Sequence, residues 1–178
     1  MRSPPVQGLL LALLCMAFLG DAAVATEYGF DEQAEVSSGI EAYQRGDYES
    51  AIRLLKPPAG RGNVEAQRIL GIMNLLGKGT VPDPSAAARW IQGAAILGDA
   101  QAQELLSFMH NQGVGVPQDY VLAYVWLKLA IIQNPDPDRE QARQAAVARL
   151  MTLIPADQRG RARNLSRQYY NRHVKPFL

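Results

Sequence analysis

Few residues in this sequence offer covalent or metal chemistry. The chain has 178 residues with one cysteine, Cys15, and two histidines, His110 and His173. Neither histidine has the second histidine, cysteine pair or carboxylate cluster that a metal site needs, so we expect no metal and no cofactor. Ser107 precedes His110 by three residues, but a nucleophile also needs an oriented base and an oxyanion pocket. One helix face does not supply these, so the sequence favours a protein without catalytic residues.

A large excess of one charge is also absent. The chain carries 18 basic and 17 acidic residues, a net charge of +1, and 48% of its residues are hydrophobic. This composition indicates a globular protein of about one domain. It gives no reason to expect a nucleic-acid partner, because overall charge does not draw the chain to a polyanion. Any charged partner has to be met by a local patch.

Long hydrophobic runs are missing except near the start. Leu9 to Leu19 form an unbroken apolar run, preceded by Arg2 and followed by an Ala-Val-Ala stretch at 23–25. This order is typical of a secretory signal peptide over residues 1–25, cleaved after Ala25. The run is shorter than the roughly 20 residues that cross a bilayer, so a retained anchor is the weaker alternative. We expect the mature chain to be periplasmic or secreted, without cysteine and without a membrane span.

The sequence does contain a repeat of 36 residues. The matching pairs are Ala66 and Ala102, Leu70 and Leu106, Met73 and Met109, Gly77 and Gly113, Gly79 and Gly115, Asp83 and Asp119, Ala87 and Ala123, Trp90 and Trp126, and Ala94 and Ala130. One period earlier, Asp47 and Ala51 mark a third and divergent unit. Three units are about the minimum that a solenoid needs to bury a continuous core.

Each unit has the pattern of two helices. Apolar residues recur at three- and four-residue spacings on either side of a turn that contains Gly77 and Gly79. Asp83 then stands where an N-cap is expected, with Pro84 in the first helical position, and Asp119 takes the same place in the next unit. The repeat is therefore interpreted as a series of helix pairs.

This pattern resembles the Sel-1-like repeat, a relative of the tetratricopeptide repeat. The motif A-x-x-x-L-G…G-x-G…D…A-x-x-W-x-x-x-A-A…G runs through residues 66–98 and recurs less completely in 102–130. The resemblance implies an all-α, right-handed α/α superhelical solenoid that binds other proteins. It divides the chain into a signal peptide (1–25), a tetratricopeptide-like helix pair (26–62), two Sel-1-like repeats (63–98 and 99–134) and capping helices (135–178).

Some residues depart from the family pattern. Pro57 and Pro58 lie inside the first unit and predict a break in its helix pair. The second repeat has Ile131 in place of a small residue and Asn134 in place of the closing glycine. A branch of the family that closes its units with disulfides is excluded, because the mature chain has no cysteine.

The resemblance also implies where a partner binds. In such solenoids the first helix of each unit lines the concave groove, and the residue after the Leu-Gly position faces the ligand. Those positions here hold an apolar row, Ile40, Ile72 and Phe108. Polar residues on the same helices flank the row, namely Glu65, Arg68, Glu104 and Asn111. Such a groove suits an extended or helical peptide. The alternative is that the row packs the first helix of one unit against that of the next.

The two ends of the mature chain differ in charge. Residues 26–60 carry seven acidic and three basic residues, whereas 134–178 carry four acidic and nine basic ones. We expect helices over about 138–150 and 156–172 that cap the solenoid and cover the nearly uncharged helix 121–132. On the last helix a stripe of cations is formed by Arg159, Arg163 and Arg167.

Two interpretations of this stripe stay open. It is either the solvated outer face of a capping helix or a site for an anionic partner, such as lipid headgroups, acidic polysaccharide or an acidic protein. The acidic end of a second copy is a further candidate, which would give weak head-to-tail self-association.

These features favour a protein-interaction adaptor of the bacterial cell envelope. The competing hypothesis is a small regulator or inhibitor that holds one periplasmic enzyme or sensor in the same groove. The two differ in valency, since an adaptor binds two partners at once and a regulator binds one.

Overall fold

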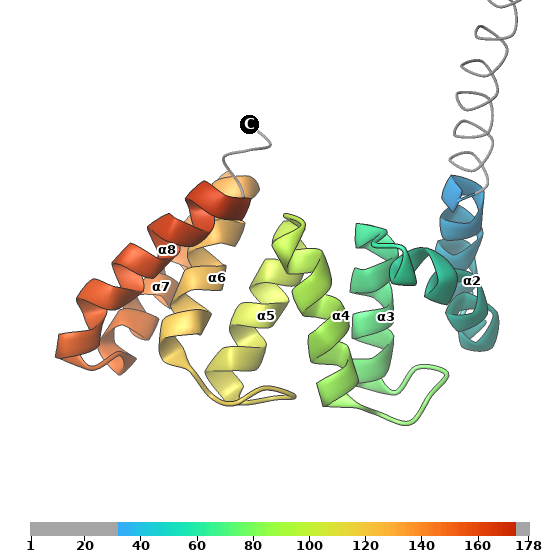
Figure 1. The fold of residues 1–178 in the computed structure, drawn as a ribbon, viewed down its shortest axis with the longest axis horizontal. Helices are drawn as coiled ribbons and strands as arrows, with labels where there is room; N and C mark the ends of the chain where they lie inside the picture. Colours follow the sequence, from blue (N-terminus) through green and yellow to red (C-terminus); the bar gives the residue numbers. More distant parts are fainter. Residues whose placement is uncertain (1–31, 174–178) are drawn as a thin grey trace, which may run out of the picture.

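A computed structural model describes residues 32–173, which form a curved row of helices joined by short turns (Figure 1). The first helix covers residues 32–44. It is followed by α2 (Tyr48–Gly60), α3 (Val64–Leu76), α4 (Pro84–Ile96), α5 (Ala100–Gln112), α6 (Tyr120–Gln133), α7 (Pro137–Leu153), the short η1 (Ala156–Gln158) and α8 (Arg159–His173). The expected all-α solenoid is confirmed. The predicted signal peptide and its cleavage after Ala25 lie outside the described residues.

Side-chain caps start the helices from α2 to α7. Each cap residue accepts a hydrogen bond from a backbone N–H two or three residues further on, which satisfies a donor that the first helical turn leaves free. The caps are Asp47, Asn63, Asp83, Asp99, Asp119 and Asp136. The predicted caps at Asp83 and Asp119 are confirmed, and Asp47, one period earlier, is a cap as well, so the 36-residue period coincides with helix starts.

The glycine turns tie each repeat to the unit before it. Gly115 lies in the loop between α5 and α6 with a φ of +70°, and a Cβ added to it would stand 2.0 Å from the carbonyl oxygen of Pro84. Gly79 holds the same place in the first repeat, where an added Cβ would stand 2.7 Å from Cβ of Tyr48. Each loop therefore packs on the start of the preceding unit's second helix.

The core is divided between two clusters of buried side chains. The first helix, α2 and α3 supply one cluster, which includes Val36, Leu55 and Met73. Helices α4 to α8 supply the larger cluster. In the larger cluster Trp126 is 2% exposed, and its ring meets that of Tyr169 edge to face at a centroid distance of 5.3 Å. Burial of this kind supplies the main stabilisation of a repeat protein without cross-links.

Helix α6 is the most completely buried element. Residues on all its sides are buried, because α5, α7 and α8 pack against it. Ala162, Leu165 and Tyr169 on α8 belong to the same cluster as α6. The expectation that the C-terminal segment covers the helix at 121–132 is confirmed.

The expected break at Pro57 and Pro58 is not present. Helix α2 continues through both prolines to Gly60, and Pro58 is buried. Both residues lie in the last turns, and their carbonyl oxygens accept hydrogen bonds from the N–H groups of Arg61 and Asn63. The helix tolerates the two missing proline N–H groups because the hydrogen bonds at its end use the proline carbonyl oxygens, which remain available as acceptors.

Among residues 32–173, no helix combines the length and the apolar character that crossing a membrane requires.

Candidate functional site

A cavity of about 350 Å³ lies between α5 and α7. Its lining is apolar at the base and in the walls, with charged side chains on the margin. The lining residues are Glu104, Ser107, Phe108, Asn111, Leu127, Arg139, Ala142, Arg143, Ala146, Arg149, Leu150 and Leu153. Leu127 and Leu150 are buried, whereas Phe108 and Leu153 are 52% and 41% exposed. The cavity thus offers an apolar surface that water can reach, as binding clefts do.

Helix α5 supplies one wall through residues spaced like one face of a helix. Glu104, Ser107, Phe108 and Asn111 follow each other at intervals of three, one and three residues. Leu106 and Met109 on the adjoining face are buried in the core, and this turns the Phe108 ring outward. The structure therefore brings three predicted site residues, Glu104, Phe108 and Asn111, to one cavity.

Helix α7 supplies the opposite wall, which the repeat pattern did not predict. Ala142, Ala146, Arg149 and Leu153 line the cavity at intervals of four, three and four residues. Two of them are alanines, and small side chains leave space in front of Phe108. The signal was present in this spacing, but the predicted helix ended at residue 150 and excluded Leu153.

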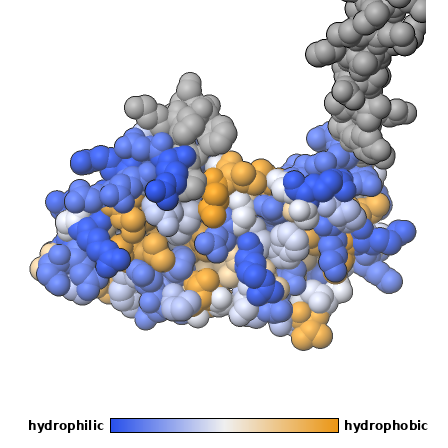
Figure 2. Space-filling model, viewed as in Figure 1, coloured by the Kyte–Doolittle hydropathy of each residue, from blue (hydrophilic) through white to orange (hydrophobic). Residues whose placement is uncertain are grey.

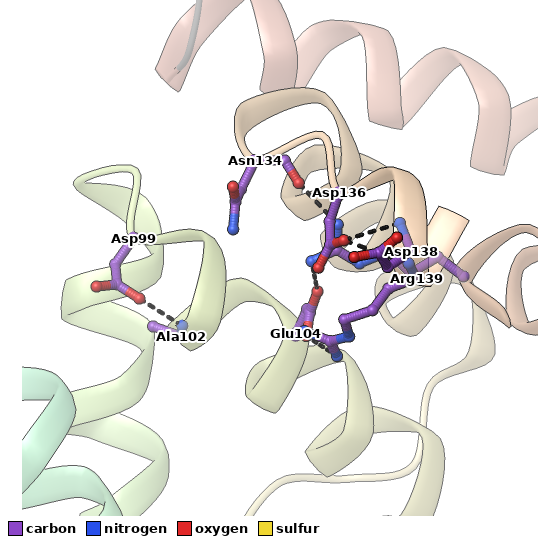
Figure 3. A network of polar contacts seen from close by, with 8 residues as sticks. Asp99, Ala102, Glu104, Asn134, Asp136, Asp138 and Arg139 are labelled. Carbon is purple, nitrogen blue, oxygen red and sulfur yellow. Dashed lines mark hydrogen bonds and ion pairs between the residues drawn. The ribbon is translucent and has the colours of Figure 1, made fainter. Parts of the chain in front are cut away.

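Ion pairs close one margin of the cavity. The Glu104 carboxylate accepts a hydrogen bond from Arg139 at 3.0 Å (Figure 3). It also accepts one from Arg143. The Arg143 side chain is 5% exposed, and its Nη1 also donates to the Asn134 carbonyl oxygen at 2.7 Å. Glu104, predicted as a partner contact, is therefore already engaged by α7.

The lining carries an excess of positive charge. Three arginines and one glutamate line the cavity, and the glutamate is paired with Arg139 and Arg143. Arg149 is exposed and makes no ion pair within residues 32–173. A bound segment with an acidic side chain would find a free guanidinium there.

Ser107 and His110 do not form a nucleophile and its base. The Ser107 hydroxyl donates to the Ala123 carbonyl oxygen at 2.7 Å, which secures α5 to α6. Burial lowers the pKa of His110, and its Nδ1 is buried without a hydrogen-bond partner. Within the described part of the chain, histidines and carboxylates nowhere gather in threes that could hold a metal ion.

The remaining groove residues of the sequence analysis lie elsewhere. Ile40 is half-buried against the first core cluster, and Ile72 is half-buried against the second. Arg68 donates to Asp99 at 3.1 Å and pairs with Glu65 at 3.5 Å. Of the predicted apolar row, only Phe108 lines the cavity between α5 and α7.

The predicted stripe on α8 is separate from this cavity. Arg159 is half-buried and its Nε donates to the Ile154 carbonyl oxygen at 3.0 Å, so it helps to start the helix. Arg163 and Arg167 are exposed. No residue of α8 lines the cavity between α5 and α7.

The row of helix pairs, with a cavity beside α5, the first helix of the second repeat, defines the class of protein as an α/α solenoid. Two stretches match the model of the Sel1 repeat, residues 64–99 and 100–135. The chain belongs to the Sel1 repeat family, whose members are generally scaffolds for protein interaction. The matched stretches begin with α3 and α5 and end two or three residues beyond α6 and α4, so they coincide with the two helix pairs α3–α4 and α5–α6.

Two solved structures show the same fold. A Sel1 repeat protein from Oxalobacter formigenes is 30% identical, with a TM-score of 0.58 over 71% of this chain and 97% of its own. The protein c5321 from uropathogenic Escherichia coli strains, described as a protective antigen with an SLR fold, is 27% identical, with a TM-score of 0.72 over 82% of this chain. This chain spans 31% of the length of c5321. No curated protein matches the sequence.

Proposed function

We propose that this chain is a protein-interaction adaptor of the bacterial cell envelope that binds a segment of its partner in the cavity between α5 and α7. The observation that carries the proposal is Phe108, a large aromatic side chain that is 52% exposed at the mouth of a preformed apolar cavity. An exposed ring beside a cavity has the form of an interface centre, because aromatic side chains bury much apolar area on contact.

The charges of the lining indicate the chemistry of the bound segment. A leucine- or phenylalanine-sized side chain would fill the space before Ala142 and Ala146, and a nearby acidic side chain would reach Arg149. Because Glu104 is already paired with Arg139 and Arg143, it does not repel such a segment as a free carboxylate would. An apolar segment with an acidic residue therefore fits better than a basic one.

The test is site-specific photo-cross-linking in cells that produce the full-length protein. The cross-linking amino acid replaces Phe108 or Leu153 at the cavity and, as a control, Val81, which is 81% exposed on the loop before α4. We expect one defined protein to be linked from positions 108 and 153 and not from position 81. Equal linking from all three positions, or none from the cavity, would contradict the proposal.

Export is a second part of the proposal and has its own test. The order of charge, apolar run and small residues in 1–25 supports cleavage after Ala25. The intact mass of protein recovered from the envelope fraction should correspond to a chain that starts at Thr26. A mass that includes residues 1–25 would favour a retained anchor instead.

A regulator that holds one envelope enzyme or sensor is the competing function. The favouring observation is that the cavity between α5 and α7 is closed at one margin by ion pairs, a shape that suits a single partner in a one-to-one complex. Mass measurement of the cross-linked, purified complex separates the two proposals. A complex with two different partners supports the adaptor, and a strictly binary complex supports the regulator.

A further inference from the structure

The exposed side of α8, called its outer face below, carries arginines along both flanks and has no acidic residue on its helix. The sequence of α8 contains no aspartate or glutamate, and the nearest acid along the chain is the exposed Asp157 in η1. Four of its arginines are exposed, Arg161, Arg163, Arg167 and Arg172. At a rise of about 1.5 Å per residue they are spread over about 16 Å of helix.

Within residues 32–173, these four arginines differ from the five that make ion pairs, and they lie together on one helix, whereas the other unpaired arginines are spread over α2, α4, α7 and the start of α8. Arg45, Arg61, Arg68, Arg139 and Arg143 all make ion pairs with carboxylates. Within residues 32–173, the four on the outer face of α8 make none. Arg163 and Arg167 even stand one turn apart, where like charges repel each other along a helix. The fold thus leaves this charge without an intramolecular counter-charge.

The composition of the face favours one kind of anionic partner. Between the arginines stand exposed residues without apolar bulk, Gly160, Asn164, Gln168 and Asn171. The apolar residues of α8, including Ala162 and Leu165, are turned toward α6. In Figure 2, the surface where Figure 1 shows α8 is mostly hydrophilic. A specific protein interface has an apolar centre, which this face lacks. Arginines among amide side chains suit a surface of many phosphates, because each phosphate can accept two hydrogen bonds from one guanidinium group.

We infer that the outer face of α8 binds the anionic lipid headgroups of a membrane surface. This inference rests on the export proposed above, because export brings the chain to a membrane rather than to nucleic acid. The face is distinct from the cavity between α5 and α7, so the chain can lie on a bilayer and hold its partner at the same time. No apolar side chain enters the bilayer in this mode, and binding depends on charge alone.

The experiment is vesicle co-sedimentation with protein expressed from the full sequence, its processed form identified by mass. One set of vesicles contains about 70% phosphatidylcholine and about 30% phosphatidylglycerol. The other set contains phosphatidylcholine alone. The test variant is R163Q/R167Q. The matched control is R53Q/R89Q, which removes the same charge from exposed positions on α2 and α4.

Each arginine near an anionic surface raises the partition coefficient about fivefold. R163Q/R167Q should lower the partition coefficient about 25-fold, and R53Q/R89Q should leave it nearly unchanged. Binding should also disappear on neutral vesicles and at high salt, because screening removes the attraction. Equal losses in both variants, or no binding by the wild type, would overturn the inference. Tighter binding to duplex DNA than to anionic vesicles would also overturn it, in favour of a different phosphate polymer.

Failure here can be told apart from failure of the proposed function. The R163Q/R167Q variant should still be photo-cross-linked to its partner from position 108. Conversely, Phe108→Glu should lose the partner and keep the vesicle binding of the wild type.

Discussion

The two Sel1 repeats share the contacts that hold their helices together, called the frame below, and differ in the side chains that face the next unit. In both, a glutamine on the first helix donates to a carbonyl oxygen eight residues earlier, Gln67 to Ala59 and Gln103 to Ala95, each at 3.0 Å. These bonds satisfy acceptors at the end of the preceding helix. The shared contacts show that the frame depends on hydrogen bonds to backbone carbonyl oxygens at helix ends, which every repeat has to satisfy.

The facing sides carry opposite charges at the same repeat position. Arg68 reaches forward to Asp99 at the start of α5, whereas Glu104, 36 residues later, reaches forward to Arg139 and Arg143 on α7. Swapping the two neighbours would place like charges together. In each repeat the charge at this position is therefore opposite to that of the group it meets in the next unit, whereas the glutamine contact is the same in both repeats.

The largest effect is expected where the frame itself is broken. Gly115→Ala would place a Cβ against the Pro84 carbonyl oxygen and force a φ of +70° on alanine. We expect a loss of about 4 kcal/mol in the free energy of unfolding, because backbone cannot move aside as a side chain can. Urea unfolding measures this. Gly160→Ala is the control, since nothing lies within 4 Å of its added Cβ, and it should be neutral or slightly stabilising. Equal effects would refute the close contact.

The next effect compares the two forward-reaching side chains. Glu104→Gln leaves the nearly buried Arg143 without a charged partner, and we expect a loss of about 3 kcal/mol. Arg68→Gln affects a pair whose side chains are 19% and 17% exposed, and we expect about 1 kcal/mol. Chemical denaturation of both variants gives the comparison. The double variant E104Q/R143M should recover much of the loss; if it is less stable than E104Q, the unpaired guanidinium is not the cause.

A smaller effect separates the two residues that follow the Leu-Gly position. Ile72→Glu places a carboxylate against the core cluster and should cost about 2 kcal/mol. Phe108→Glu changes a side chain that is 52% exposed, and stability should change by about 0.5 kcal/mol or less. Melting temperatures of the two variants check this. A Phe108 variant that melts as low as the Ile72 variant would place the ring in the core rather than at a binding surface.

The smallest effect is a pH dependence from the second repeat, which has a histidine where the first has Asn74. Burial lowers the pKa of His110 below 6.5, its ordinary value, so the fold favours the neutral ring. Its contribution to stability is complete above about pH 6.5 and declines as the pH falls toward the lowered folded-state pKa. His110→Asn should flatten the stability curve between pH 7.5 and about 5.5. An unchanged slope would assign the dependence to other groups.

Helix starts and core faces could be predicted because they follow from local chemistry. Asp83 and Asp119 are recognisable caps from their position before a helical pattern, and segment 121–132 is apolar enough to require cover on every side. The end of α2 was predicted wrongly. Proline lacks a donor, but the sequence does not show that the next residues would use its carbonyl oxygen.

The candidate site could be predicted only on the side of α5. Ile72 and Phe108 occupy the same repeat position, and nothing local distinguishes their exposure. The difference arises from what stands across from each: Ile72 meets packed core, and Phe108 faces a cavity walled by Ala142 and Ala146. The sequence period does not extend into α7, so the far wall had no repeat partner from which to be inferred.

By itself, the sequence determined the helix pairs, their caps, the turns between them and the family of the chain, because these depend on spacings of three, four and 36 residues. Only the tertiary structure decided which surface stays open. The packing of α7 against α6 and the pairing of Arg143 with Glu104 leave a cavity on one side, and α8 leaves its arginines unpaired on another. Those outcomes depend on distances between segments far apart in the chain, which no local pattern encodes.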